Sequence, residues 1–372
     1  MALPLARRTF LASALALAAG CATPARSDRR ATRITLLGQS LVKHDICAQQ
    51  WPGRAAVSAR LRSADVVFSD LEVAIRGPNA GAPTRDALTL HTAEPGILDC
   101  LREIGIDLLA TSNNHAFDLN TGGIVDAIAA LRARGIPFAG TGMNLAEASR
   151  PALVSTPGRP VALVAAASGK VREGGMATAE RPGVAEIRRG ADGALDAADV
   201  ARTLAAIRAS AAPGAIVIFY LHNHHWEEPD NWVTPEWQRT LARAAIDAGA
   251  SLFVAHGTPL LQGLEIYRGR PLFHGLGSFI FQTIKEDHYD ALAWQSAAVE
   301  CRFEADRFVG AELVPIQLNA EGVGGPNDMA TRGRPSLATP AEARIILERL
   351  AFLSERLGHR LDHDGVTARL LP

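Results

Sequence analysis

Polar side chains that can bind a metal follow several apolar runs of this chain. The runs at 66–69, 108–111, 216–220 and 252–255 are followed by Asp70 and Glu72, by Asn113, Asn114 and His115, by His222, and by His256. The carboxyl ends of parallel strands meet at one edge of an open α/β sheet, so we expect these groups to converge. Carboxylates, carboxamides and imidazoles together suit a divalent cation such as Mn, Zn or Mg. The pattern therefore predicts a metal site at that edge.

Each of these groups also has a structural interpretation. Asn113 and Asn114 are typical of a turn that caps the following helix, and Asp70 with Glu72 is typical of an exposed acidic pair. Other polar residues are expected to lie outside the site, namely a solvated loop with His224, His225, Glu227 and Glu228, and the isolated His274, His359 and His363. The repetition of polar groups at successive strand ends favours a common site over these separate explanations.

The runs that position these groups alternate with helical segments. The expected strands are 34–37, 66–69, 108–111, 161–165, 216–220 and 252–255. Their continuous apolar character is typical of strands that are covered on both faces. The expected helices are 95–104, 123–134, 197–210 and 235–248. This alternation predicts a βαβ arrangement and an α/β fold.

The last third of the chain changes to antiparallel hairpins. Residues 264–267 and 271–274 flank an Arg-Gly-Arg turn, and 297–303 is expected to pair with 308–316. A loop is expected at 319–335 and a final helix at 340–357. No internal repeat interrupts the pattern, so we expect one domain from residue 31 to residue 372.

Residues 1–30 have the pattern of an export signal. Arg7 and Arg8 precede an apolar run, Leu11–Ala19, that is too short to span a bilayer. The Arg-Arg-Thr-Phe-Leu string resembles a twin-arginine signal, and Ala-Ala-Gly-Cys21 resembles a lipoprotein processing site. Ordinary cleavage without modification of Cys21 is the alternative. The segment predicts an exported protein that is periplasmic or anchored at the cell envelope by lipid on Cys21.

The charge balance limits the partners. The chain has 38 basic and 39 acidic residues, and its net charge of -1 gives no field that would favour nucleic acid or an anionic membrane surface. We therefore expect a small or neutral partner, no nucleic acid, and membrane contact only through a lipid anchor. The three lysines, at 43, 170 and 285, are interpreted as a compositional feature without a mechanistic role.

The cysteines of the mature chain give no recognisable framework. Cys47, Cys100 and Cys301 are widely spaced and odd in number, which indicates neither a disulfide pattern nor a zinc site. We expect them to be buried as small hydrophobic side chains.

Four ordered segments of this chain resemble a known family. The stretch Gly105–Ala148, with the string Ser-Asn-Asn-His-Ala-Phe-Asp, resembles the signature of the CapA family, poly-gamma-glutamate capsule synthesis proteins with a metallophosphatase-like fold. The segments 68–75, 217–228 and 247–281 are similar to three further motifs of that family. The resemblance implies a four-layer α/β/β/α sandwich and an exported protein that acts on a capsule or envelope polymer.

The resemblance also implies roles for individual residues. His115 would contact the leaving group or developing charge as general acid, and Asp118 would orient His115. The implied metal ligands are Glu72 or Asp70, Asn114, His222 and His256.

Two departures from the family pattern concern the same half of the implied site. Gln39 replaces the usual aspartate on the first strand, and Pro259 replaces the final histidine of the closing motif. Both lost groups serve the same ion of a two-ion centre, so the departures predict one divalent ion rather than two.

Three hypotheses follow for function. The first is a metal-dependent hydrolase that acts on a poly-gamma-glutamate-like envelope polymer or a small anionic substrate. The second is a non-catalytic protein that binds an envelope polymer or an assembly partner on a degenerate metallophosphatase fold. The third is a hydrolase with an altered site, in which His224 or His225 replaces a lost ligand.

Overall fold

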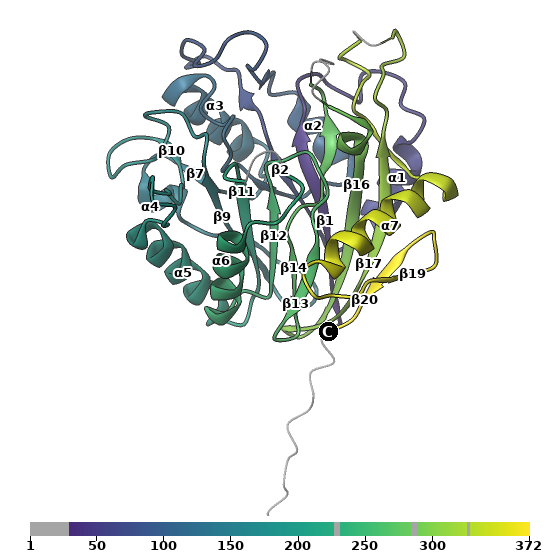
Figure 1. The fold of residues 1–372 in the computed structure, drawn as a ribbon. Helices are drawn as coiled ribbons and strands as arrows, with labels where there is room; N and C mark the ends of the chain where they lie inside the picture. The colour runs from purple at the N-terminus through teal and green to yellow at the C-terminus, as the bar shows by residue number, and fades with distance from the viewer. Residues whose placement is uncertain (1–29, 227–230, 284–288, 326–327) are drawn as a thin grey trace, which may run out of the picture.

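The fold is built around two β-sheets that share one core (Figure 1). This computed structural model describes residues 30–226, 231–283, 289–325 and 328–372. The predicted export signal, apart from residue 30, lies outside the described residues, as do Glu227, Glu228 and Lys285.

The larger sheet has ten strands. Its path runs β19 (Asp362–His363), β20 (Ala368–Leu370), β17 (Arg307–Leu318), β16 (Gln295–Glu304), β1 (Thr32–Leu41), β2 (Val66–Leu71), β5 (Leu108–Ala110) and β6 (Phe138–Ala139). Off this path, β15 (Ser278–Phe281) pairs with β1, and β18 (Pro335–Leu337) pairs with β17. Because β1, β2, β5 and β6 are parallel, their carboxyl ends lie at one edge.

The smaller sheet has six strands, in the order β13 (Leu264–Tyr267), β14 (Arg270–Phe273), β12 (Leu252–His256), β11 (Ile216–Asn223), β9 (Val161–Ser168) and β8 (Ala152–Val154). Strands β9, β11, β12 and β14 are parallel. Two short pairs, β3 (Ala74–Ile75) with β4 (Thr92–Ala93) and β7 (Thr141–Gly142) with β10 (Gly183–Val184), lie outside both sheets.

Helices cover the outer face of each sheet. The helices are α1 (Arg54–Leu61), α2 (Ile97–Ile104), α3 (Asn120–Ala133), α4 (Leu145–Ala148), α5 (Ala197–Ala211), α6 (Glu236–Asp247) and α7 (Pro340–Glu355). Helices α1 and α2 contribute to the core on the larger sheet, and α5 and α6 to the core on the smaller sheet. The predicted four-layer α/β/β/α sandwich is confirmed.

Alternation of side chains along each strand separates the cores. Leu36 points into the core between the sheets, whereas Leu37 points into the core beneath α1 and α2. On β11, Tyr220 lies between the sheets and Phe219 packs under α5 and α6. Successive strand residues face opposite sides, so a continuous apolar run is what a strand covered on both faces requires.

The expectation that no cysteines pair is wrong, because Cys47 and Cys100 form a disulfide. Cys47 lies in the loop after β1 and Cys100 on α2, and 53 residues separate them along the chain. No local spacing could show this pair, since the packing of α2 beside the end of β1 brings the two sulfurs together. Cys301 is free and buried, as expected.

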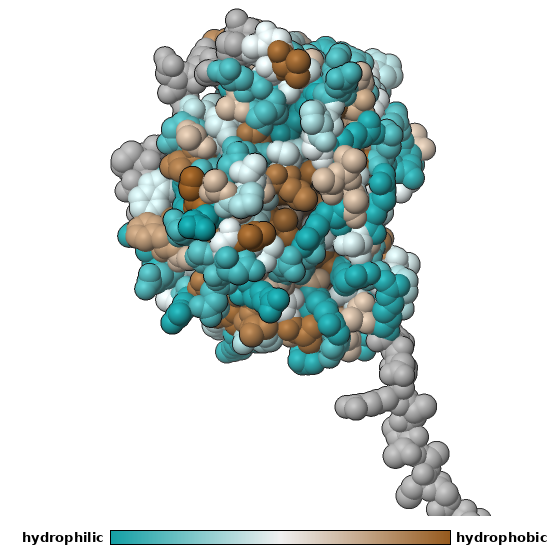
Figure 2. Space-filling view, turned by 90° about the vertical axis from the view of Figure 1, so that its right-hand side faces the viewer, coloured by the Kyte–Doolittle hydropathy of each residue, from teal (hydrophilic) through white to brown (hydrophobic). Residues whose placement is uncertain are grey.

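The surface mixes polar and apolar groups. On the side shown in Figure 2, small groups of apolar side chains lie between hydrophilic ones. Ile345 and Phe352 of α7 are among the exposed large apolar residues. Within the described ranges, no helix combines the length and the apolar character that a membrane crossing requires.

Candidate metal and proton-transfer site

The carboxyl ends of the central strands of both sheets form one buried polar cluster. Asp70 lies near the end of β2 and Glu72 follows this strand, Asn114 follows β5, and His222 lies near the end of β11. The Nε2 atom of His222 is 2.9 Å from Asn114 Oδ1 and 3.5 Å from Glu72 Oε1. The structure therefore brings together three of the predicted ligands, from segments on three different strands.

The other ring nitrogen of His222 is held from behind. Its Nδ1 lies 3.1 Å from Asp70 Oδ2 and 3.1 Å from the Tyr220 hydroxyl. Asp70 Oδ1 in turn accepts a hydrogen bond of 3.0 Å from Asn113 Nδ2. Metal-binding histidines commonly use one nitrogen for the ion and the other for a carboxylate, an arrangement that fixes the ring. This geometry assigns Asp70 to positioning His222 and leaves Glu72 as the carboxylate facing the same side as Asn114.

Asn113 and Asn114 do not cap the following helix. Helix α3 has Leu119 at its N-cap position and no side-chain cap. Asn113 instead bonds Asp70, and its Oδ1 accepts from the His115 backbone N–H at 3.1 Å. The alternative interpretation of these residues as a simple capping turn therefore does not hold.

His224 joins the cluster, contrary to the prediction of a solvated loop. Glu72, His222 and His224 each offer one ligand atom, and these atoms lie within 4.8 Å of one another. Both ring nitrogens of His224 are buried and have no hydrogen-bond partner in the described part of the chain, and the same holds for Glu72 Oε2. His225 is directed elsewhere, since its ring packs edge-on against Trp237.

The unpartnered atoms test whether these residues fit an ion. Burial, the Asp70 carboxylate and that of Asp118 raise the pKa of Glu72 well above its ordinary value. Burial and the charge of His222 lower the pKa of His224 well below its ordinary value, which favours the neutral, ligating imidazole. A buried carboxylate oxygen without a partner among the described residues, beside the unpartnered ring nitrogens of His224 and the ring of His222, is a donor set that suits a divalent cation, so the residues fit.

His256 stays outside the group of three. It is the register partner of His222 on β12, and its ring lies against Tyr220, at 5.3 Å between centroids, and Phe68. Neither of its ring nitrogens reaches hydrogen-bonding geometry, and burial and the charge of His222 lower its pKa to about 3. Its nitrogens are thus as free of partners in the described ranges as those of His224, but His256 is not in the group whose ligand atoms lie within 4.8 Å of one another, so its role as a ligand stays a prediction.

The two departures from the family pattern have different surroundings. Gln39 is buried, and its Oε1 accepts a hydrogen bond of 2.9 Å from the backbone N–H of Gly257. Gly257 has φ +126, and a Cβ there would meet the Asn223 carbonyl oxygen at 1.8 Å. The Gln39 side chain therefore stabilises the tight loop that connects β12 to Pro259.

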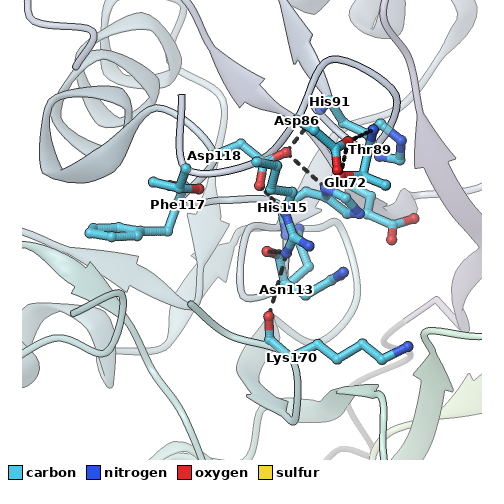
Figure 3. A network of polar contacts seen from close by, with 12 residues as sticks. Glu72, Asp86, Thr89, His91, Asn113, His115, Phe117, Asp118 and Lys170 are labelled. Carbon is cyan, nitrogen blue, oxygen red and sulfur yellow. Dashed lines mark hydrogen bonds and ion pairs between the residues drawn. The ribbon is translucent and has the colours of Figure 1, made fainter. Parts of the chain in front are cut away.

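A second polar network surrounds His115 (Figure 3). His115 Nδ1 is 2.8 Å from Asp118 Oδ2, and Asp118 Oδ1 accepts from Arg85 Nε at 2.6 Å. The backbone N–H of His91 also donates to Asp118, at 2.8 Å. This arrangement is the one expected for Asp118 as the residue that orients His115, with Nδ1 protonated and Nε2 left for a substrate.

Arg85 and His91 were missed by the sequence analysis. The His91 ring stacks on the His115 ring with 3.8 Å between centroids, and a nitrogen of Arg85 also bonds the Asn114 carbonyl oxygen. Burial and the Arg85 cation lower the pKa of His115 well below its ordinary value. Both residues come from the long segment between β3 and β4, and its length without regular structure was the available signal of function.

A cavity of about 270 Å³ opens onto both networks. Asn114, His115 and His224 lie in its wall, with His91 and Arg85 beside them. Lys170, which the sequence analysis left without a role, also lines it. The arrangement could hold a cation at the base of a small pocket and exchange a proton through His115.

Comparisons with known proteins agree with this architecture. The family model described as "Bacterial capsule synthesis protein PGA_cap" matches residues 32–283. An uncharacterised protein of Sinorhizobium fredii is 28% identical over 87% of this chain and 90% of its own length. A probable polyglutamine synthesis accessory protein of Mycobacterium tuberculosis is 31% identical over 62% of this chain and 60% of its own. The capsule biosynthesis protein CapA of Bacillus anthracis is 26% identical over 60% and 52%, respectively.

Proposed function

Because the chain belongs to the PGA_cap family of bacterial capsule synthesis proteins, we propose that it acts on an anionic envelope polymer at a site for one divalent ion. The observation that carries this proposal is the convergence of Glu72, His222 and His224 within 4.8 Å, with unpartnered buried atoms facing one another.

The proposed ligands are Glu72, Asn114, His222 and His224, and the ion is Mn, Zn or Mg. When bound, the ion would supply Lewis-acid polarisation of a phosphoryl or acyl oxygen of the substrate. His224, one of the two histidines that the altered-site hypothesis names as a replacement for a lost ligand, lies in the cluster and His256 does not, which favours the altered-site hypothesis among the three. Gln39 and Pro259 remain the reason to expect one ion rather than two.

The residues of the second network would handle protons. Asp118 holds His115 in the tautomer with Nδ1 protonated, which leaves Nε2 to accept or donate a proton at the substrate. Arg85 balances the buried charge of Asp118 and limits the movement of this carboxylate. An anionic substrate group beside His115 would raise its pKa and so favour the protonated form that a general acid requires.

The proposed substrate is a poly-gamma-glutamate-like polymer. The names of the Mycobacterium and Bacillus relatives concern polyglutamine and capsule synthesis, which supports a polymer of the envelope built from glutamate or its amide. The cationic groups near the cavity, Arg85 and Lys170, are compatible with an anion there.

We also propose that the protein is exported and periplasmic or lipid-anchored at the cell envelope. The Cys47–Cys100 disulfide supports this location, because disulfides persist in oxidising compartments and are rare in the bacterial cytosol. The Arg7-Arg8 pattern and Cys21 of the N-terminal segment point in the same direction.

A second function is favoured by one specific observation. The Gln39 carboxamide is used for the Gly257 loop, and Pro259 offers no donor, so half of the ancestral centre has become structural. A protein that binds a polymer or an assembly partner without catalysis would keep the fold and the cleft, and would not need the two metal ligands that are lost at Gln39 and Pro259. Restoring Gln39→Asp together with Pro259→His discriminates: phosphoester hydrolysis that appears only in the double variant supports the binder.

The test of the main proposal is the metal content of the exported chain. We expect one ion per chain by elemental analysis, and loss of that ion in His222→Ala, Asn114→Ala and His224→Ala. His363→Ala, at an exposed histidine of β19, is the matched control and should keep the ion. Unchanged metal in both His222→Ala and Asn114→Ala would reject the site, whereas loss in those two alone would return the fourth place to His256.

A further inference from the structure

The mouth of the cavity carries positive charge without matching acids. Arg85 and Lys170 line it, and no carboxylate does so among the described residues. The charge of Arg85 is balanced by Asp118 at 2.6 Å. Lys170 has no ion-pair partner in the part of the chain that the structure describes, and its Nζ lies 5.1 Å from the centre of the Trp226 ring. The charge of Lys170 therefore remains available to a ligand.

Lys170 is held in place by its backbone. Its φ is +55, a left-handed conformation that residues with a side chain rarely adopt. Its carbonyl oxygen accepts from Arg85 at 3.4 Å. Strained positions that the surrounding structure enforces cluster at ligand sites. The backbone of Lys170 is thus hydrogen-bonded to Arg85, which also pairs with Asp118.

Lys43 adds a second ammonium group near the same cavity. Its backbone N–H donates to Gln282 Oε1 at 2.7 Å. The residue after Gln282, Thr283, lines the cavity. Burial and the charge of His115, and after them the charge of Lys43, lower the pKa of His91, which also lines the cavity; this agrees with a position of Lys43 beside the cavity wall. In the described ranges it has no ion-pair partner, and burial lowers its pKa.

The usage of lysine makes this placement informative. Of 38 basic residues only three are lysines, at 43, 170 and 285; of the two that the structure describes, Lys170 lines this cavity and Lys43 lies beside its wall, bonded through its backbone to Gln282. An ammonium group is a compact point charge with rotatable donors, suited to a single carboxylate, whereas arginine favours bidentate contacts. Lysine at these two places fits separate singly charged groups.

Resting on the function proposed above, we propose that Lys170 and Lys43 bind two carboxylates of a polymer end and so present it to His115. The cavity, at about 270 Å³, lies at the small end of ligand pockets, which favours a terminal residue over an internal stretch of chain. The last residue of a gamma-linked glutamate chain carries two carboxylates, one at the α-carbon and one at the free γ-carbon of its side chain. Leu88 and the hydroxyl of Thr89 complete the wall for its methylene groups and amide.

The test is calorimetric binding of a gamma-linked glutamate pentamer to the metal-loaded exported chain. We expect Lys170→Asn and Lys43→Gln each to weaken binding about tenfold, as loss of a charge-assisted contact does. Asparagine tolerates the left-handed backbone at 170, so that variant separates charge from folding. Arg344→Gln, at an exposed arginine of α7, removes the same charge elsewhere and should bind the pentamer as the unmodified chain does.

Further probes separate the outcomes. A pentamer whose terminal carboxylates are amidated should bind at least about tenfold more weakly than the unmodified pentamer. The amidated pentamer should also bind equally to the unmodified chain and to Lys170→Asn. Equal weakening in Arg344→Gln, unchanged binding in both lysine variants, or tighter binding of a glycerol phosphate oligomer would each overturn the proposal. Metal content is measured on the same samples. Normal metal content together with unchanged pentamer binding in both lysine variants refutes the role of the lysine pair but not the metal site. Absent metal with lysine-dependent binding refutes the ion and leaves the lysine pair standing.

Discussion

Replacing Glu72 by glutamine should have opposite effects in the metal-free and the metal-loaded protein. Glu72 is buried, its Oε2 has no partner among the described residues, and Asp70 adds like charge. Without metal, folding must therefore either bury an unpaired carboxylate or take up a proton. With metal, the same carboxylate is the anionic ligand that holds the ion.

The magnitude in the metal-free protein follows from proton linkage. Because the folded-state pKa is raised above the ordinary value of 4.5, the penalty is absent below about pH 4.5 and grows as the pH rises toward the folded-state pKa. Each pH unit contributes about 1.4 kcal/mol, so at pH 7 the penalty is at most about 3 kcal/mol. Glu72→Gln removes this titration and with it the penalty. The buried amide of the glutamine lacks full hydrogen bonding, which costs about 1 kcal/mol and reduces the net gain in stability by that amount.

Urea unfolding measures both arms. With a chelator at pH 7, we expect Glu72→Gln to be about 2 kcal/mol more stable than the unmodified chain; this difference should vanish at about pH 5 and reverse to about 1 kcal/mol below about pH 4.5, where only the cost of the amide remains. With saturating metal, only the unmodified chain should gain stability. Glu348→Gln, at an exposed glutamate of α7, is the control and should change neither quantity. A metal-free Glu72→Gln variant with no pH-dependent gain would refute this account of the cluster.

Three further predictions concern other parts of the molecule. Asp118→Asn should lower the free energy of unfolding by about 3 kcal/mol in urea, because it leaves the buried Arg85 cation unpaired, and an unchanged value would contradict that pairing. Burial and a nearby aspartate raise the pKa of Glu186 to about 7, so its neutral form favours folding below about pH 4.5 and this contribution is lost as the pH rises through 7. After allowance for solvent screening the loss is about 1 kcal/mol, and a pH series of unfolding curves in which Glu186→Gln keeps the same slope as the unmodified chain would rule it out. Replacing Cys47 and Cys100 by serine should cost about 4 kcal/mol in chemical denaturation, from the entropy of the loop they close, and a cost near zero would show that the bond is not formed.

Much of the fold could be predicted from local pattern. The strands at 66–69 and 252–255 were recognisable because both of their faces are buried, which makes the run continuously apolar. Their ends were less certain, since β11 runs to Asn223 rather than stopping at 220. Polar residues such as His222 can extend a strand when the partner strands supply the backbone hydrogen bonds, and a pattern of hydrophobicity does not record that.

The site was predictable only in part for the same reason. Glu72, Asn114 and His222 follow apolar runs directly, so position alone indicated them. His224 looked like a loop residue because it lies in a polar stretch of sequence, and its approach to Glu72, which follows a strand of the other sheet, is a tertiary contact that the sequence does not record. Arg85 belongs to a segment without periodic structure, and only the folded chain shows that it meets Asp118.

The most direct test of the central claim is the anomalous diffraction of crystals of the exported chain grown with Mn or Zn. The account predicts one peak per chain, bonded to Glu72, Asn114, His222 and His224. Two peaks, or a single peak on the side of Gln39 and Pro259, would contradict a centre reduced to one ion at these four residues.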